Sequence, residues 1–298
     1  MHGLTLAADL GGTSVKLGVL ERGAVVARAR LPAEATGSLE ARLPDLEGAF
    51  RRLLAETDAD LEAVRGVGVA LPCLLSRDRR RVLSAIGKYP DAETVDLEAW
   101  ARETWGAPVV LEGDAVAALL GEWRHGAARD CQTVAMLTFG TGIGSAAILE
   151  GAPYRGAHGA GGVLFGHLTV DLEGERCPCG NVGCVEALAS TWSLRREHGP
   201  RADLEWLFSG DAPETLRAHV LEAWGVAVVN VVHALDPERV VLGGGAMRAG
   251  DQILPSIREH VRAHAWRPPG LEVAVVAGTL GDDAALLGLE WAVQTSYP

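Results

Sequence analysis

The chain has 298 residues, of which 48% are hydrophobic, and this is enough for one large or two medium-sized domains. Its formal net charge of −12 argues against nucleic acid as the main partner, because phosphate backbones are bound by Lys and Arg, and it disfavours an anionic membrane surface. Apolar runs such as Val226–Val232 are too short to span a bilayer, and no basic segment precedes a long apolar one at the start. We therefore expect a cytoplasmic protein without a nucleic-acid or membrane partner.

The first part of the chain predicts strands and helices in alternation. Leu4–Leu10 is an apolar run typical of a buried strand, and Gly11–Thr13 is a tight turn after it. Apolar residues at helical spacing predict a long helix over Leu39–Thr57, and Asp114 stands near the N-cap of a later helix. Further strands are expected at Ser14–Leu20, Ala24–Leu31, Val64–Leu71 and Pro108–Leu111, and further helices at Asp96–Trp105 and Asp114–Trp123.

A second unit of the same plan is expected from Thr133 onward. Leu4–Leu20 and Val134–Leu149 each consist of an apolar strand, a Gly-Thr turn and another apolar strand, which indicates an internal repeat. The expected strands are Thr133–Phe139, Ser145–Leu149, Arg239–Leu242 and Leu271–Ala277, and the expected helices are Val185–Glu197, Pro213–Ala234, Ile253–Ala265 and Asp283–Val293. The order predicts a mixed α/β protein with a hairpin at the start of each half.

The turn between the first two strands is a candidate phosphate loop. Because glycine lets a phosphate approach backbone N–H groups closely, Gly11 and Gly12 predict an anion-binding turn. Thr13 adds a hydroxyl donor and Lys16 a positive charge, whereas Asp9 is placed to hold Mg²⁺ directly or through water. An ordinary hairpin turn is the alternative.

Two more glycine-rich turns follow strands in the second half. The first contains Gly140, Thr141, Gly142 and Gly144, lacks the GK[ST] ending of a Walker loop and leads into a strand rather than a helix. The second contains Gly243, Gly244 and Gly245, which we expect under the adenosine of a nucleotide, with a flexible turn as the alternative. The turns at Gly11 and Gly140 are expected to face each other across a cleft and hold successive phosphates.

The segment Gly166–Glu186 carries the most specific pattern of the chain. It contains His167, Cys177, Cys179 and Cys184, the four nitrogen and sulfur ligands that a closed tetrahedral zinc site needs. Glycine, proline and asparagine between these residues allow the backbone to fold around one ion. Reduced cysteines in a loop are the alternative, but this spacing in an intracellular protein favours a metal site.

These segments together resemble the ROK family of sugar kinases and repressors, within the actin-like, hexokinase-like ATPase superfamily. The resemblance is carried by LAADLGGTSVKLGVL, EGDAVAALLGE, LTFGTGIGSAAILEG, GHLTVDLEGERCPCGNVGCVEALAS, DPERVVLGGGA and GDDAALLG, in this order. It implies a two-domain actin-like (ribonuclease H-like) fold with a structural zinc loop, ATP and a sugar bound in the cleft, and a homodimer. The expected domains are residues 1–113 and 114–283, with the C-terminal helix 284–298 a candidate to complete the first.

The resemblance also implies roles for single residues. Asp114 matches the catalytic base, which accepts the proton of a sugar hydroxyl as it attacks the γ-phosphoryl group. His167 matches a residue that binds zinc through one ring nitrogen and faces the sugar with the other, and Glu186 matches a carboxylate near the anomeric end of the sugar. The alternatives are that Asp114 only caps its helix and that Glu186 is only a helix-start acid.

Three positions depart from the family pattern for sugar binding. Gly113 replaces the usual Asn before the catalytic Asp, Leu164 stands where a Glu is usual, and the loop Ser84–Asp91 lacks its usual Asn. Lys88, with Tyr89 and Asp91, is a candidate for replacement contacts. Because a buried hydroxyl without a partner costs roughly 1–3 kcal/mol, the departures suggest a different sugar, a different pose or weak binding.

The expected function is therefore ATP-dependent, Mg²⁺-requiring phosphorylation of a hexose or hexose derivative, glucose-like and at the primary 6-hydroxyl. A non-catalytic sugar or nucleotide sensor is the alternative that the three departures favour. A sugar-responsive repressor is a further alternative, which the acidic charge and the early first strand at Leu4 disfavour. The sequence leaves the identity of the sugar, and dimer against tetramer, open.

Overall fold

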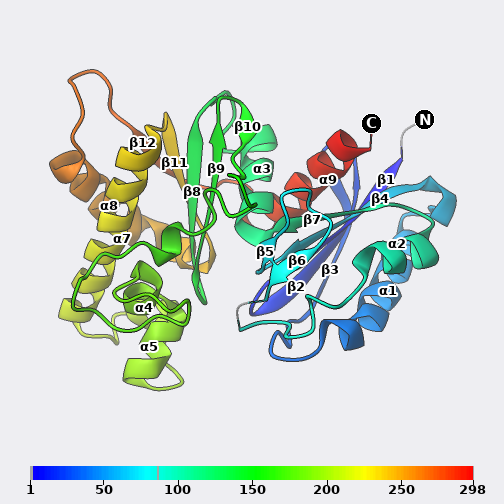
Figure 1. Ribbon diagram of the computed structural model, residues 1–298, viewed down its shortest axis with the longest axis horizontal. Coiled ribbons are helices and arrows are strands. Elements are labelled where there is room, and N and C mark those ends of the chain that lie inside the picture. Colours follow the sequence, from blue (N-terminus) through cyan, green and yellow to red (C-terminus); the bar gives the residue numbers. More distant parts are fainter. Residues whose placement is uncertain (1–2, 86, 298) are drawn as a thin grey trace. The chain divides into compact units, whose positions relative to one another are not determined.

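The computed structural model describes residues 3–85 and 87–297, and the chain divides into two compact units (Figure 1). The first unit contains residues 1–129, 155–160 and 280–298, and the second contains residues 130–154 and 161–279. The chain therefore passes between the units four times, and each unit is assembled from separate stretches of sequence.

The first unit is built on a five-stranded sheet in the order β3-β2-β1-β4-β7. Strand β1 pairs antiparallel with β2 and parallel with β4, and β4 pairs parallel with β7. The strands of this sheet are β1 (Leu4–Leu10), β2 (Ser14–Glu21), β3 (Ala24–Pro32), β4 (Val64–Leu71) and β7 (Val109–Gly113). The unit also contains a two-stranded sheet of β5 (Leu74–Leu75) and β6 (Val82–Ser84). Its helices are α1 (Leu39–Glu56), α2 (Leu97–Trp105), α3 (Asp114–His125) and α9 (Ala284–Ser296).

Helices cover both faces of this sheet. Apolar residues of α1 and α2 share one core with the strands, whereas residues of α3 and α9 form a second core that includes Ala7 and Ala70 of the strands. Helices α3 and α9 lie side by side (Figure 1), and glycine is required where they cross. A Cβ on Gly121 would lie 1.9 Å from the carbonyl oxygen of Ala284, and one on Gly288 would lie 1.8 Å from that of Ala117.

The second unit repeats this sheet in the order β10-β9-β8-β11-β12. Strand β8 pairs antiparallel with β9 and parallel with β11, and β11 pairs parallel with β12, so the first sheet is reproduced strand for strand. Its strands are β8 (Val134–Phe139), β9 (Ile143–Leu149), β10 (Ala152–Pro153), β11 (Arg239–Gly243) and β12 (Ala274–Ala277). Its helices are α4 (Val185–Ala189), α5 (Thr191–His198), α6 (Leu204–Phe208), α7 (Glu214–Leu235) and α8 (Gly250–His264). The internal repeat predicted from the two hairpins is confirmed.

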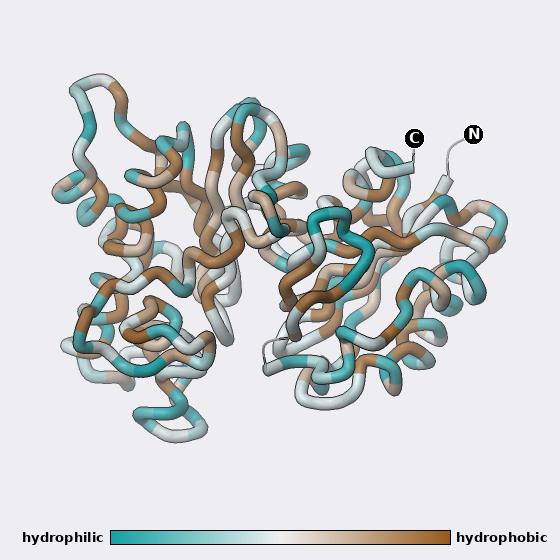
Figure 2. The backbone as a smooth tube through the Cα atoms, viewed as in Figure 1, coloured by the Kyte–Doolittle hydropathy of each residue, from teal (hydrophilic) through white to brown (hydrophobic). Residues whose placement is uncertain are grey.

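Helix α7 forms the centre of the second core. Its fully buried Trp224 stacks on Phe139 of β8 with ring centroids 4.2 Å apart, and its indole N–H donates to the carbonyl of Ala189 at 2.8 Å. By length and composition alone α7 also meets the criteria for a membrane span, and among the described residues it is the one helix that does so. Buried core helices of this kind commonly satisfy the same criteria, and half of its most apolar window is buried inside the unit. Strand β8, in the middle of the second sheet, is coloured mainly brown, as hydrophobic, in Figure 2.

The division between the units differs from the predicted boundary after residue 113. Helix α3 belongs to the first unit because it packs along α9, and the first crossing follows Arg129. The C-terminal helix also lies in the first unit. The helix predicted over Val185–Glu197 is wrong as one element, because Ser190 and Ser193 form a capping box that starts a new helix at Thr191.

Candidate active site

The predicted residues of the first unit gather at one edge of its sheet. Strands β1, β4 and β7 are parallel, so their carboxyl ends lie at the same edge. Asp9 lies one residue before the end of β1 and pairs with Ala70 of β4, while Leu71 of β4 pairs with Gly113 at the end of β7. Ligands of open α/β sheets bind at the carboxyl ends of parallel strands, so this edge is where a substrate site is expected.

Asp9 is a buried carboxylate with a cationic neighbour. It is 6% exposed, and Lys16 Nζ lies 3.1 Å from its Oδ2 and 3.3 Å from Oδ1 of Asp282. Burial raises the pKa of Asp9, the ammonium of Lys16 lowers it, and the carboxylate of Asp114 raises it further. Lys16, which the sequence assigned to the phosphates, is thus engaged by two carboxylates, one of which also pairs with Arg30.

Asp114 is the first residue of α3, directly after β7. The N-cap residue is Gly113, which has no side chain to accept a hydrogen bond from the helix start. Oδ1 of Asp114 accepts a hydrogen bond from the N–H of Ala115 at 2.7 Å. The other carboxylate oxygen is not used in this contact. Because the side chain is half-buried and lies at the carboxyl edge, its contact with Ala115 leaves one carboxylate oxygen for chemistry.

Among the three candidates for replacement sugar contacts, Tyr89 and Asp91 form hydrogen bonds within the first unit instead. Tyr89 is fully buried, and its hydroxyl donates to the carbonyl of Ala33 at 3.3 Å. Asp91 accepts hydrogen bonds from the Ser38 hydroxyl at 2.6 Å and from the N–H of Leu39 at 2.6 Å, so it secures the start of α1. Lys88, which is half-buried, therefore remains the candidate in this loop. Ile86 of the same loop lies outside the described residues.

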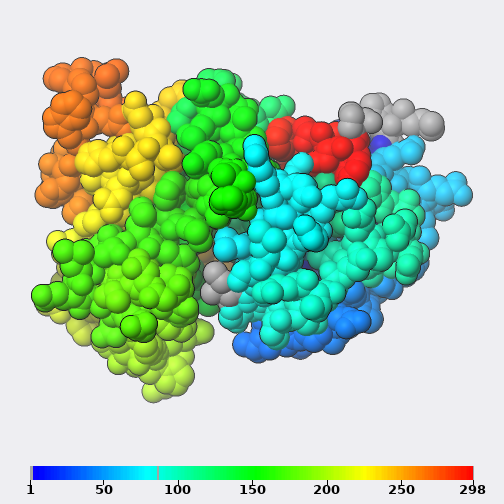
Figure 3. Space-filling model, in the orientation of Figure 1, coloured from blue at the N-terminus to red at the C-terminus, as the bar shows by residue number. Residues whose placement is uncertain are grey.

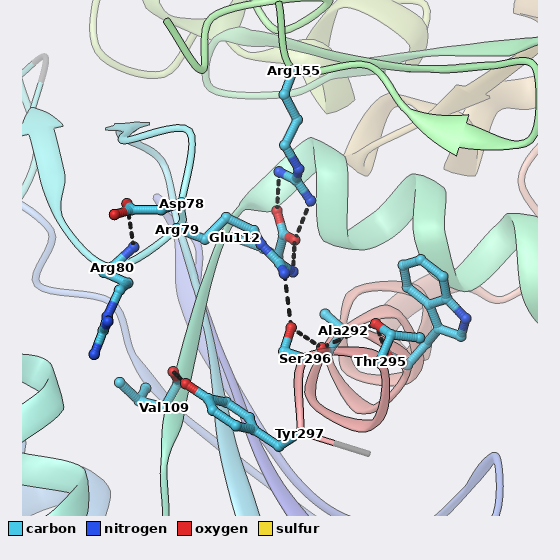
Figure 4. Close-up of polar contacts among 11 residues, drawn as sticks. Asp78, Arg79, Arg80, Val109, Glu112, Arg155, Ala292, Thr295, Ser296 and Tyr297 are labelled. Carbon is cyan, nitrogen blue, oxygen red and sulfur yellow. Dashed lines mark hydrogen bonds and ion pairs between the residues drawn. The ribbon is translucent and has the colours of Figure 1, made fainter.

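A buried ion cluster supports the end of β7 (Figure 4). The Glu112 side chain is fully buried, and Arg155 donates to both of its oxygens, from Nη1 at 3.0 Å and from Nη2 at 2.6 Å. Arg79 donates to the same carboxylate at 3.0 Å and to the Ser296 hydroxyl at 2.7 Å. On the surface shown in Figure 3, the cyan segment that contains Arg79 lies beside the red C-terminal helix. The cluster joins four separate stretches of the first unit two residues before Asp114.

The glycine turns of the second unit also share one sheet edge. Gly243 ends β11 and pairs with Thr138 near the end of β8, which is parallel to it and leads into Gly140. Gly244 has φ +85°, and a Cβ there would lie 2.4 Å from the carbonyl oxygen of Phe139, so only glycine fits this crossing. The structure thus brings the Gly140–Gly144 and Gly243–Gly245 turns together.

The four predicted metal ligands lie in one cluster. One ligand atom from each of His167, Cys177, Cys179 and Cys184 lies within 4.8 Å of all the others. The Sγ atoms of Cys179 and Cys184 are 3.7 Å apart, and Cys177 Sγ is 3.5 Å from His167 Nδ1. Ligands at the corners of a tetrahedron around zinc stand roughly 3.8 Å apart, so this geometry fits a zinc ion. Since His167 Nδ1 faces the cluster, Nε2 is the nitrogen left for another partner.

Glu186 lies in the first turn of α4, two residues after the last of these ligands. Its Oε2 accepts the backbone N–H of Ile143 at 2.7 Å, so the carboxylate reaches the Gly140–Gly144 turn. Leu164 precedes the 3₁₀ turn Phe165–His167 and is 37% exposed. An exposed aliphatic side chain at this position offers a sugar no hydrogen bond.

The partners of Glu112 and the contact between Glu186 and Ile143 are not predicted by the sequence. An acid at the end of the apolar strand Val109–Gly113 is a signal for a buried partner, because a buried carboxylate requires one. The partner itself, Arg155, stands 43 positions away without a local pattern. Glu186 bonds to a backbone N–H of Ile143, and every residue type except proline has such a group, so the sequence carries no signal for this contact.

Comparison with known proteins places this architecture in a family. The model of the ROK family matches residues 5–296. The glucokinase of Thermotoga maritima is 31% identical over 310 residues, which are 95% of this chain and 95% of that protein. The crystal structure of a ROK family glucokinase from Streptomyces griseus, in complex with glucose and AMPPNP, has a TM-score of 0.80 and 27% identity and covers 98% of this chain and 100% of its own.

The crystal structure of the ROK hexokinase from Thermus thermophilus has a TM-score of 0.76 and 31% identity, over 99% of this chain and 100% of its own. The likeness to both structures extends over the two sheets and their helices, so the predicted actin-like ATPase fold is confirmed. With a family model that spans nearly every residue, this chain belongs to the ROK family.

Proposed function

We propose that this protein is an ATP-dependent sugar kinase that transfers the γ-phosphoryl group of ATP to a hexose. The observation that carries the proposal is the position of Asp114 at the carboxyl edge of the first sheet, beside Asp9, in a chain that matches glucokinases over nearly its whole length. The primary 6-hydroxyl is the proposed acceptor, because a primary alcohol is the least hindered nucleophile of a hexose.

In this proposal Asp114 accepts the proton of the attacking hydroxyl. Its partly buried carboxylate, with one oxygen held by the Ala115 N–H, has a fixed direction, and positioning supplies most of the catalysis in phosphoryl transfer. Asp9 holds Mg²⁺ directly or through water, and Mg²⁺ neutralises charge on the phosphates. Burial raises the pKa of Asp9, and the ammonium of Lys16, 3.1 Å from its Oδ2, partly opposes that rise.

The proposed nucleotide contacts are the glycine turns. The turn of Gly11, Gly12 and Thr13 and the turn of Gly140, Thr141, Gly142 and Gly144 bind the phosphates in this proposal, and Gly243, Gly244 and Gly245 lie under the adenosine. The N–H of Gly140 donates to the carbonyl of Gly142 at 3.0 Å, so it closes the second turn and is not one of the phosphate donors. The proposed sugar contacts are Glu186, the Nε2 atom of His167, the backbone of Gly113 and the ammonium of Lys88. Leu164 removes one usual hydrogen bond from this set, so the preferred sugar differs from the common one or is bound more weakly.

The proposal includes a zinc ion held by His167, Cys177, Cys179 and Cys184. Zinc supplies a structural staple there, which fixes the two ends of the loop 167–184 and so orients His167 and Glu186. The separations of 3.7 Å between the Sγ atoms of Cys179 and Cys184 and of 3.5 Å between Cys177 Sγ and His167 Nδ1 support it. A cytoplasmic location, in which thiols stay reduced, and a homodimer complete the proposal.

A second candidate is a non-catalytic sugar or nucleotide sensor. The observation that favours it is the loss of polar sugar contacts at Gly113 and Leu164, together with the structural tasks of Tyr89 and Asp91. The two candidates differ in turnover rather than in binding.

The test is a coupled ADP-release assay of zinc-loaded protein with Mg·ATP and a panel of hexoses and amino sugars. We expect sugar-dependent ADP release with at least one of them, and none with its 6-deoxy analogue, which lacks the accepting hydroxyl. Sugar or nucleotide binding in calorimetry without ADP release would favour the sensor, and neither binding nor turnover would refute both.

A further inference from the structure

The Glu186 carboxylate is part of the second phosphate turn as well as of the sugar site. Its Oε2 lies 2.7 Å from the backbone nitrogen of Ile143. A Cβ built on Gly142 would lie 2.5 Å from the same oxygen and 3.2 Å from the carboxylate carbon. The carboxylate therefore occupies the space beside Gly142, and residue 142 must be glycine for Glu186 to remain there.

Two backbone hydrogen bonds also hold this turn. The N–H of Thr191 donates to the carbonyl of Gly140, and that of Trp192 donates to the carbonyl of Thr141, both at 3.0 Å. Both donors belong to the first residues of α5, directly after the segment that contains Glu186. Two carbonyls and one N–H of the turn are thus bound by residues 186–192.

Residues 186–192 are in turn secured by the metal cluster. The N–H of Val185 donates to the carbonyl of Leu168 at 3.1 Å, next to the ligand His167, and the N–H of Ala187 donates to the carbonyl of the ligand Cys184 at 2.9 Å. A continuous series of bonds therefore runs from the ligands through the start of α4 to Ile143.

We infer that Glu186 is a positioning residue for the nucleotide: its carboxylate holds the Gly140–Ile143 turn in the shape that binds phosphate, in addition to contacting the sugar. The inference rests on the proposed function. One carboxylate oxygen is directed to Ile143 and the other is left for a sugar hydroxyl, so the sugar and the nucleotide share this side chain. Loss of the carboxylate then weakens nucleotide binding even when no sugar is present.

The test measures binding of Mg·AMPPNP by calorimetry, without sugar, to the zinc-loaded wild-type protein and to three variants. Glu186→Ala removes the acceptor, and we expect affinity to fall by roughly tenfold or more, within the range for loss of a hydrogen bond to a charged group. Glu186→Gln keeps an acceptor oxygen for Ile143, so it is expected to bind nucleotide within about threefold of wild type while its sugar KM rises. Glu197→Ala, an exposed acid on α5 paired with Arg196, controls for the lost charge.

Gly142→Ala provides an independent arm. The added methyl group displaces only the end of the flexible Glu186 side chain, so the fold is retained, while nucleotide and sugar affinity both fall. In a Glu186→Ala background the same substitution meets no carboxylate, and its additional effect on nucleotide affinity is expected to disappear. Zinc content and thermal unfolding, measured for each variant, separate this effect from loss of the metal loop.

Three results support or overturn the inference and distinguish its failure from failure of the proposed function. Weak nucleotide binding by Glu186→Ala together with rescue by Glu186→Gln supports it. Wild-type nucleotide affinity in Glu186→Ala overturns it and leaves the kinase proposal intact, with Glu186 a sugar ligand alone. No nucleotide binding by the wild-type protein overturns the proposed function and this inference together.

Discussion

Arg155 donates two hydrogen bonds to the fully buried carboxylate of Glu112, and through them the segment Arg155–Ala160 is part of the first unit although its neighbours in sequence belong to the second. A buried carboxylate that is ionised requires cationic or hydrogen-bonding partners, because its desolvation is otherwise uncompensated. Here the partners are two arginines that approach from different parts of the chain (Figure 4). The pair fixes Glu112, and Asp114 follows two residues later.

Arg155→Ala is expected to destabilise the first unit by about 3–5 kcal/mol, since it leaves the buried carboxylate with one partner. Arg80→Ala is the matched control: Arg80 pairs with Glu98 at the surface, where solvent screens the pair, so its loss is expected to change the unfolding midpoint little. Urea unfolding followed by fluorescence measures both. Equal midpoints for the two variants would show that the Glu112 cluster does not contribute to stability as its burial requires.

Asp114→Asn is expected to lower kcat by about 10²–10⁴-fold, because the amide cannot accept the hydroxyl proton. The amide oxygen can still accept the Ala115 N–H, so the helix start and the KM values should change little. Steady-state kinetics with the best sugar of the panel measures the change. Asp96→Asn, which alters an N-cap Asp of α2, is the control and should keep wild-type kcat. A small change in kcat for Asp114→Asn would assign the proton acceptor elsewhere.

Cys177→Ser and Cys184→Ser are each expected to reduce the zinc content from about one ion per chain to well below it and to raise the sugar KM. Both thiols are buried within the cluster, and the loop that they close carries His167 and leads to Glu186. Cys73→Ser, which changes a cysteine of the first unit, should retain its zinc. Elemental analysis of the purified proteins measures the zinc content. A wild-type zinc content far below one ion per chain would contradict the metal site.

Glu290→Gln is expected to stabilise the first unit at pH 8 and to lose this advantage towards pH 4. Glu290 is 2% exposed on α9, and burial raises its pKa even though its carboxylate accepts the Gly23 N–H at 2.9 Å. A raised pKa means that the folded protein binds the proton more tightly than the unfolded chain. The stabilisation from this group is therefore complete below its unfolded pKa and is lost as the pH rises through its folded pKa.

The neutral amide avoids that loss, so the Tm difference between Glu290→Gln and wild type should grow as the pH rises. Thermal unfolding between pH 4 and 8 measures it, with Glu98→Gln as a surface control. A Tm difference that is the same at every pH would show that ionisation of Glu290 is not its origin.

The sequence predicted those features that depend on short-range pattern. The strand Leu4–Leu10 and the strand Val64–Leu71 were predicted with the bounds that the structure gives, because a continuous apolar run is its own signal. The metal cluster was predicted for a similar reason, since its four ligands lie on one loop. Hairpins in both halves predicted the repeat of the two sheets.

The features that the sequence did not predict depend on partners that are distant in sequence or lack a distinctive side chain. Asp91 accepts a hydrogen bond from the start of α1, more than fifty residues away in sequence. Because this partner is distant, the sequence left Asp91 as a candidate sugar contact. The hairpin of β5 and β6 has strands of two and three residues, too short for a periodic signal. The break at Ser190 depends on a capping box of two serines, which interrupts an otherwise helical pattern.

The most direct test of the central claim is identification of the product by ³¹P and ¹H NMR after zinc-loaded protein is incubated with Mg·ATP and glucose, and in parallel with each other sugar of the panel. The account predicts a hexose 6-phosphate formed in equal amount to ADP by the wild-type protein, and a greatly reduced yield with Asp114→Asn. Intact ATP and unmodified sugar in every reaction, from protein that carries its zinc and is folded, would contradict it.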